Sequence, residues 1–109
     1  MSRNKRLEVY TLLVKVGRGP GDGLPSGAAG AALLCYATGV DEAEAVRETV
    51  QLLKTADLAP LDVTGYGTLR EREAEGHEIG EDDKGLMKQA LEDNAVIVAE
   101  TTILQEDEI

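Results

Sequence analysis

A glycine-rich segment divides the first part of the chain into two β-prone runs. The eleven residues Gly17–Gly27 contain five glycines and two prolines, a composition that regular helices and strands do not tolerate. Residues 7–16, before this segment, are rich in Val, Leu and Thr, and residues 31–38, after it, form a short apolar run. The alanines of the second run also allow a helix, but its exit through a Thr-Gly pair favours a strand. We therefore expect two strands joined by a flexible loop over residues 17–30.

The clearest helix signal follows the second of these runs. Asp41 is a good N-cap residue, because its carboxylate can accept a hydrogen bond from the first turn, and Glu44 stands three positions later, as in a capping box. The apolar residues in this segment recur with a period near that of a helix: Ala43, Val46, Val50 and Leu53. The pattern predicts an amphipathic helix over residues 42–56 that packs on a sheet.

The next segment predicts a strand of irregular shape. Residues 61–69 alternate apolar and polar side chains, as a half-exposed strand does. Gly65 and Gly67 flank Tyr66 in this run, and such glycines either clear space around the ring or mark a β-bulge, which is the commoner case. Residues 70–82 are nearly all polar and predict an exposed connection, with a possible short edge strand.

A second helix and a last strand complete the pattern. Residues 83–94 place four apolar side chains on one helical face, and residues 95–104 have the alternating β-branched residues of a strand. Residues 1–6 and 105–109 are predicted to be flexible tails, because chain ends of this polarity have little to pack against.

These elements follow the order β-β-α-β-(β)-α-β, which predicts an α+β domain with a mainly antiparallel sheet. Because each helix has a single apolar stripe, we expect both helices on one face of that sheet. From Ala31 to Leu104 the pattern resembles the ferredoxin-like α/β plait, with the strand at residues 7–16 added and the third plait strand weak or missing. The resemblance lies in the pattern of elements and carries no diagnostic motif. Proteins of this shape include enzymes, small-molecule sensors and dimers of unknown role, so it implies no particular function.

Length and composition favour a small domain that associates with a second copy. The 109 residues fit one domain, over residues 1–109. The chain has no Phe or Trp and three Tyr, so Leu, Val, Ile and Ala must supply nearly all the apolar area of the core. Burial of such area is worth about 25 cal/mol per Å². A small core without large aromatic rings gains from extra burial against a partner, which predicts a homodimer.

The charge balance weighs against nucleic acid and membrane partners. Twenty-one acidic residues against eleven basic ones give a formal net charge of −10, which repels phosphates and anionic lipid surfaces. We interpret the basic cluster of Arg3, Lys5 and Arg6 as a frayed terminus. The apolar run that follows is interrupted by charged residues, so we see neither a secretory leader nor a transmembrane span and expect a cytoplasmic location.

The glycine-rich loop lacks the spacing of a phosphate-binding motif. Asp22 stands where the third glycine of G-x-G-x-x-G belongs, Pro25 interrupts the entry to any helix, and no G-x-x-x-x-G-K-[ST] sequence occurs. We therefore predict no bound cofactor. A flexible connection is the main interpretation of the loop, and a lid or partner-binding loop is the alternative.

Tyr66 and His77 are the candidate catalytic residues. His77 is the one histidine, and its carboxylate neighbours Glu75 and Glu78 could make it an acid/base group or a metal ligand. A single His in a charged segment is more often a surface residue. Cys35 lies within an apolar run, which predicts a buried and unreactive thiol, and a lone cysteine excludes an intramolecular disulfide and a cysteine-based zinc site.

Seven carboxylates crowd residues 71–83 and could recruit a divalent cation, but they lack the spacing of a calcium loop. We expect a solvated acidic face and no metal site. If residues 70–82 formed an edge strand, Glu71, Glu73 and Glu75 would share one of its faces, where charge blocks edge-to-edge aggregation.

The sequence contains no recognisable catalytic set, so the leading hypothesis is a non-catalytic, homodimeric binding or interaction module. Its acidic surface could recognise a small molecule or a basic protein. One alternative is a small enzyme with its active site in a dimer cleft, built from Tyr66, His77 and one carboxylate. Another alternative is an acidic inhibitor that neutralises a basic protein partner.

Overall fold

The computed structural model describes residues 6–109, and it confirms the α+β class and the antiparallel sheet expected from the sequence. The predicted N-terminal tail lies outside the described residues except for Arg6. The elements, in chain order, are β1 (Glu8–Gly17), β2 (Gly30–Gly39), α1 (Glu42–Thr55), β3 (Ala59–Thr68), α2 (Leu69–Ala74), α3 (Glu81–Asp93), β4 (Val96–Leu104) and the 3₁₀ turn η1 (Glu106–Glu108). The run at residues 31–38 is thus a strand, as predicted.

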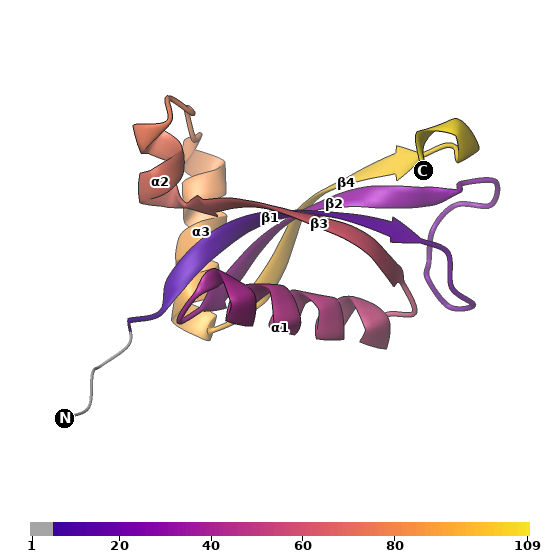
Figure 1. The fold of residues 1–109 in the computed structure, drawn as a ribbon, viewed down its shortest axis with the longest axis horizontal. Helices are drawn as coiled ribbons and strands as arrows, with labels where there is room; N and C mark the ends of the chain where they lie inside the picture. Colours follow the sequence, from indigo (N-terminus) through magenta and orange to yellow (C-terminus); the bar gives the residue numbers. More distant parts are fainter. Residues whose placement is uncertain (1–5) are drawn as a thin grey trace.

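A long hairpin forms the centre of the sheet (Figure 1). β1 and β2 pair without a register shift from Glu8 opposite Gly39 to Gly17 opposite Gly30. β3 then pairs antiparallel with β1 and β4 pairs antiparallel with β2, so the strand order is β3-β1-β2-β4. The two later strands are therefore the two edges of the sheet.

Each face of the sheet has its own hydrophobic cluster, because successive side chains of a strand point to opposite faces. Beneath α1 lies the cluster that we call the α1 core, made by Tyr10, Leu12, Val14, Val16, Ala31, Leu33, Cys35, Ala37, Ala45 and Leu53. Against α3 lies a smaller one, the α3 core, in which Tyr36, Met87 and Ala90 are buried. Val9, Leu34, Leu69 and Ile97 are among the partly buried side chains packed against it.

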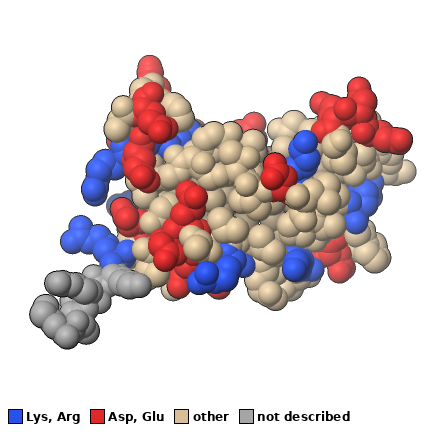
Figure 2. Space-filling model, viewed as in Figure 1, with Lys and Arg blue, Asp and Glu red and all other residues tan. Residues whose placement is uncertain are grey.

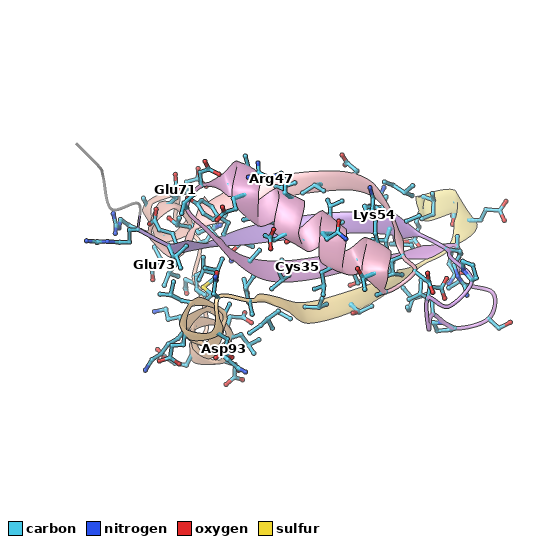
Figure 3. The ribbon with its side chains drawn as sticks, turned by 90° about the horizontal axis from the view of Figure 1, so that it is seen from below. Cys35, Arg47, Lys54, Glu71, Glu73 and Asp93 are labelled. Carbon is cyan, nitrogen blue, oxygen red and sulfur yellow. The ribbon has the colours of Figure 1, made fainter. Side chains whose placement is uncertain are left out.

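The expectation that both helices cover one face of the sheet is therefore wrong. Leu33 and Cys35 of β2 pack beneath α1, whereas Leu34 and Tyr36, their neighbours in sequence, pack against α3. Figure 1 shows α1 along one side of the twisted sheet, and Figure 3 shows α3 nearly end-on where α1 is seen lengthwise. A strand that is apolar on both sides must be covered on both sides, and one helical layer cannot do this.

The segment at residues 70–82 also differs from its prediction. It contains no strand, so the third plait strand, expected to be weak or missing, is absent, and the unpredicted helix α2 stands in its place. The helix begins because Thr68 Oγ1 accepts a hydrogen bond from the Glu71 N–H at 3.2 Å, while the Glu71 carboxylate accepts one from the Thr68 N–H at 2.9 Å. This is a capping box, and its T-x-x-E signature is visible in the sequence. Glu71, Glu73 and Glu75 are exposed as predicted, but on a helix and its cap.

The other helix ends follow the sequence signals. The Asp41 side chain accepts a hydrogen bond from the Glu44 N–H at 2.8 Å, and α1 begins directly after Asp41. Asn94 adopts the left-handed conformation, with φ of 49°, and ends α3. The predicted tail over residues 105–109 contains η1, in which Gln105 N–H donates to the Glu108 carboxylate at 2.8 Å.

The α2 cap gives the first prediction. Substitution Thr68→Ala removes one half of the capping box, which should lower the free energy of unfolding by about 1 kcal/mol. Urea denaturation measures this loss, and amide hydrogen exchange should show faster exchange confined to α2. Ser26→Ala, in the exposed glycine-rich loop, is the control and should change neither quantity. Equal stability of Thr68→Ala and the parent protein would contradict the role of the cap.

Candidate functional site

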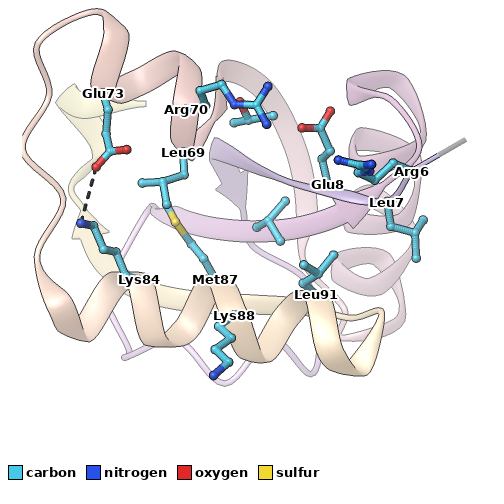
Figure 4. Close-up of a pocket in the computed structure, with 12 residues that line it drawn as sticks. Arg6, Leu7, Glu8, Leu69, Arg70, Glu73, Lys84, Met87, Lys88 and Leu91 are labelled. Atoms are coloured by element: carbon cyan, nitrogen blue, oxygen red, sulfur yellow. Dashed lines mark ion pairs between the residues drawn. The ribbon is translucent and has the colours of Figure 1, made fainter.

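An open groove of about 520 Å³ lies where α3, the start of α2 and the start of β1 meet (Figure 4). We call it the α3 groove. Its apolar floor comes from three elements, and its members are Leu7, Val9, Leu69, Met87 and Leu91. The volume lies within the range of about 300–1,000 Å³ typical of small-molecule sites.

Local sequence places each floor residue. Met87 and Leu91 are one helical turn apart on α3 and so share a face of that helix. Leu69 is the first residue of α2, which the Thr68 cap fixes against the sheet. Val9 is on the face of β1 opposite to the buried Tyr10. In Figure 4 the side chains of Leu69 and Met87 meet at one end of the floor, and Leu91 and Leu7 lie toward the other end.

Charged side chains surround this floor. Glu8 is the first residue of β1, and Arg6 lies just before this strand. Arg70 and Glu73 come from α2, and the two lysines of the rim, Lys84 and Lys88, come from α3. Lys84 Nζ lies 3.5 Å from Glu73 Oε2, an ion pair that bridges the two helices across the groove. Both partners are well exposed, so the pair contributes little to stability. The sequence prediction of a frayed terminus missed Arg6, which the structure places at the groove.

Beside the groove, polar side chains of α2 and α3 surround the buried Tyr36 of β2. The Tyr36 side chain is 1% exposed, and its hydroxyl is influenced by the charges of Arg72 and Asp83. Arg72 Nη1 also donates to Thr11 Oγ1 at 3.2 Å. Burial, with the negative charge of Asp83, raises the pKa of the Tyr36 hydroxyl above its ordinary value. The Arg72–Thr11 hydrogen bond therefore ties α2 to β1.

His77 and Tyr66 lie apart from the floor of the groove, and neither lines any of the three cavities described here. His77 is exposed, as predicted for a surface residue, and its Nδ1 accepts a hydrogen bond from Arg72 Nε at 3.3 Å. Tyr66 is 39% exposed and stands at a register shift, where Thr11 pairs with Gly67 and Leu12 with Gly65. It is thus the extra residue of a β-bulge. Among the hydrogen bonds of the described residues, none joins Tyr66 to His77.

Cys35 is buried, as predicted, and belongs to the α1 core. Burial raises the pKa of its thiol to about 11, because an apolar surrounding disfavours the thiolate. A thiol in this state is a poor nucleophile at neutral pH.

The glycine-rich loop is closed by one guanidinium group. Arg18 Nε and Nη2 donate to the Asp22 carboxylate at 2.7 and 3.2 Å, and Nη1 donates to the carbonyl oxygens of Pro25 at 2.9 Å and Ala28 at 2.7 Å. The Asp22 side chain is 3% exposed. The loop joins two strands and contributes to no helix, which agrees with the absence of a phosphate-binding motif.

The glycines of this loop serve close packing. A Cβ atom at Gly19 would lie 1.9 Å from the carbonyl oxygen of Asp57, and one at Gly21 would lie 2.6 Å from the Asp57 carboxylate. The loop therefore docks on the turn between α1 and β3, where another residue type would clash.

Two other cavities are more polar. One, of about 640 Å³, lies between α1 and the start of β4, and six of its nine lining residues are polar, among them Glu44 and Glu48, with no basic residue. The other, of about 460 Å³, is lined by Glu8, Glu42 and Glu71 beside Arg70. The α3 groove differs from both in its apolar floor and in its four basic side chains.

Over residues 6–109, no three His, Cys, Asp or Glu side chains are grouped so that they could hold a metal ion. In the same part of the chain, no helix is both long enough and apolar enough to cross a membrane.

The structure is an α+β domain in which helices cover both faces of one antiparallel sheet and an open groove lies beside α3. The sequence profile of the family described as Domain of unknown function (DUF8846) matches residues 9–105. The chain belongs to this family, whose span covers the whole sheet and all three helices. Neither a curated protein nor a solved structure matches the chain significantly.

The Arg18–Asp22 pair gives a prediction on pH. Arg18, together with the backbone N–H groups of Gly19 and Leu24, holds the pKa of Asp22 far below its usual range. Stabilisation by this carboxylate is therefore complete above the unfolded-state pKa of about 3.9 and is lost as the pH falls through the lower folded-state value.

Substitution Asp22→Asn should lower the melting temperature at pH 7, and the difference from the parent should shrink as the pH falls toward 2. Thermal denaturation monitored by circular dichroism at several pH values measures this. Glu48→Gln, on the exposed side of α1, is the control. A difference that stays constant from pH 7 to pH 2 would show that Asp22 does not act through its charge.

Proposed function

We propose that this chain is a non-catalytic binding module that works as a homodimer, and that its ligand lies in the α3 groove. The observation that carries the proposal is the groove itself: five apolar side chains line an open groove of about 520 Å³, and Leu91 among them is 42% exposed. An apolar cavity with a few charged groups at its edge is the usual form of a ligand site. Neither the buried Cys35 thiol nor the His77 imidazole described above lines this groove.

The groove also meets the mechanical requirements of a binding site. Its floor is fixed, because Thr38 Oγ1 donates to the Ala90 carbonyl oxygen at 2.8 Å and ties α3 to β2, while Arg72 ties α2 to the sheet. A ligand that enters a preformed floor loses little binding energy to ordering of the protein. Met87 contributes a flexible, polarizable side chain that adapts to different shapes.

The homodimer is the second part of the proposal, and the composition of β4 supports it. β4 is an edge strand, and its nine residues include one charged side chain, Glu100, and no Gly or Pro. β3, the other edge, contains Pro60, Gly65 and Gly67 and has two register shifts. Glycine, proline and bulges protect an edge from pairing, so β4 is the edge better suited to a second copy.

The alternatives from the sequence have less support. An enzyme built on Tyr66 and His77 needs those side chains to face one cavity, and the described contacts do not unite them. Inhibition of a basic protein rests on the acidic surface alone; Figure 2 shows acidic groups gathered toward two ends of one face, with uncharged surface between. A cytoplasmic location belongs to the main proposal, because a free thiol such as Cys35 suits a reducing compartment.

A matched pair of leucine variants tests the groove. Leu91 and Leu52 are helical residues with nearly equal exposure, 42% and 44%, but Leu91 lines the α3 groove and Leu52 lies on α1. The neutral dye Nile red should show a fluorescence increase with the parent protein, and Leu91→Asp should weaken its binding at least about tenfold, because a carboxylate in the floor must lose water. Leu52→Asp should bind as the parent does. Weaker binding by Leu52→Asp, with unchanged binding by Leu91→Asp, would place the ligand beside α1.

Light scattering after size exclusion tests the dimer. The parent protein at micromolar concentration should show twice the mass of one chain. Lysine at two exposed positions of β4, Thr101→Lys with Thr102→Lys, should shift the protein to a monomer, because charge on an edge strand opposes pairing. A monomeric parent protein would remove the dimer from the proposal and leave the groove untouched.

A further inference from the structure

We propose that the ligand of the α3 groove is an amphipathic anion, a hydrocarbon chain that ends in a carboxylate, because the groove joins an apolar floor to a cationic rim. The inference rests on the proposed function, and it adds the chemical class of the ligand. The floor selects the hydrocarbon chain and the rim selects the charge.

The formal charge around the groove is opposite in sign to the net charge of the whole chain. Four of the eleven basic residues of the chain line this one groove, against two of its twenty-one acidic residues. The formal net charge of the whole chain is −10. A random distribution of these residues would surround the groove with excess carboxylate. A cavity with locally positive potential and low-dielectric walls raises the local concentration of anions.

Two of the basic groups are available for a carboxylate. Over residues 6–109 the ion pairs are Arg18–Asp22 and Lys84–Glu73, so Arg6 and Arg70 form no ion pair there. Arg70 also borders the cavity that Glu8, Glu42 and Glu71 line. In Figure 4 both guanidinium groups lie on the β1 and α2 side of the floor, opposite α3. A guanidinium presents paired N–H donors that match the two oxygens of a carboxylate. Arg70 and Leu69 line the same groove, so head group and chain can be bound at once.

The floor itself favours a hydrocarbon chain. Its side chains are aliphatic or thioether groups, which offer contact area and no strong hydrogen-bonding partner. A polar ligand would lose water there without compensation, whereas a methylene group gains about 0.8 kcal/mol on burial. Because 1.4 kcal/mol corresponds to a factor of ten in affinity, each buried methylene should tighten binding about fourfold.

Three ten-carbon probes separate the contribution of the charged head group from that of the hydrocarbon chain. Isothermal titration calorimetry of the full-length protein would use decanoate, decan-1-ol and decyltrimethylammonium below their micelle concentrations. Decanoate should bind about tenfold more tightly than decan-1-ol, and the cation should bind more weakly than the alcohol. Octanoate should bind about fifteenfold more weakly than decanoate, because it lacks two methylenes at about fourfold each. Equal affinity for the acid and the alcohol would overturn the inference.

Arginine variants locate the head group. Arg70→Gln should weaken decanoate binding about tenfold and leave decan-1-ol binding unchanged, since the variant loses the charge-assisted hydrogen bond to the carboxylate. Arg6→Gln should have a smaller effect in the same direction, because Arg6 lies at the end of the groove. Arg47→Gln, on the exposed side of α1, is the matched control and should bind decanoate as the parent does. If Arg70→Gln and Arg47→Gln weaken decanoate binding equally, the affinity depends only on the net charge of the protein, and the inference is overturned.

The outcomes also distinguish this inference from the proposed function. Suppose that Nile red and decan-1-ol bind the parent protein and that Leu91→Asp weakens their binding. If decanoate then binds no more tightly than decan-1-ol, the binding module stands and the anionic ligand is wrong. If none of the probes binds, both are wrong. If Leu91→Asp converts a dimer into a monomer, a second copy of the chain occupies the groove, which overturns the small anionic ligand.

Discussion

β2 is apolar on both of its faces, and the rest of the structure depends on covering them. Leu33, Cys35 and Ala37 point to one side, and Leu34 and Tyr36 point to the other. A strand with this composition is stable only between two layers, so α1 and α3 must take opposite faces. The central hairpin then leaves β3 and β4 at the edges, and α2 and α3 meet the start of β1 where the second layer ends. The α3 groove exists because that layer covers only part of its face.

The sequence predicted the elements better than their arrangement. The four strands and the two longer helices were expected close to their observed bounds, because alternation, the Asp41 cap and the helical stripe are local signals. α2 was missed although Thr68 and Glu71 carry a capping signature, since the alternating glutamates that follow also fit an edge strand. The side of the sheet that each helix covers depends on which residues of β2 face it. The apolar residues at successive positions of β2 carried this information, but the prediction relied on the single apolar stripe of each helix.

The candidate site was less predictable, because its parts come from distant segments. Met87 and Leu91 were expected on the apolar face of a helix, but a sequence pattern cannot show that this face remains partly uncovered. Arg6 and Arg70 look like unrelated surface charges until the fold brings them together. Conversely, the isolated residues that attract attention in a sequence, His77 and Tyr66, occupy a surface hydrogen bond and a bulge. Cys35 was assigned correctly, because an apolar strand strongly favours burial.

The unequal size of the two hydrophobic clusters has a consequence for how the molecule opens. The α1 core contains ten buried side chains, whereas three are buried in the α3 core. Regions with few buried apolar contacts exchange their amide protons through partial openings that cost less than global unfolding. The layer of α2 and α3 is therefore the part of the domain that detaches first, while the hairpin and α1 stay folded. A ligand that contacts both α3 and β1 would hold this layer on the sheet. Ligand binding would therefore slow amide hydrogen exchange along α3, including at residues that do not touch the ligand.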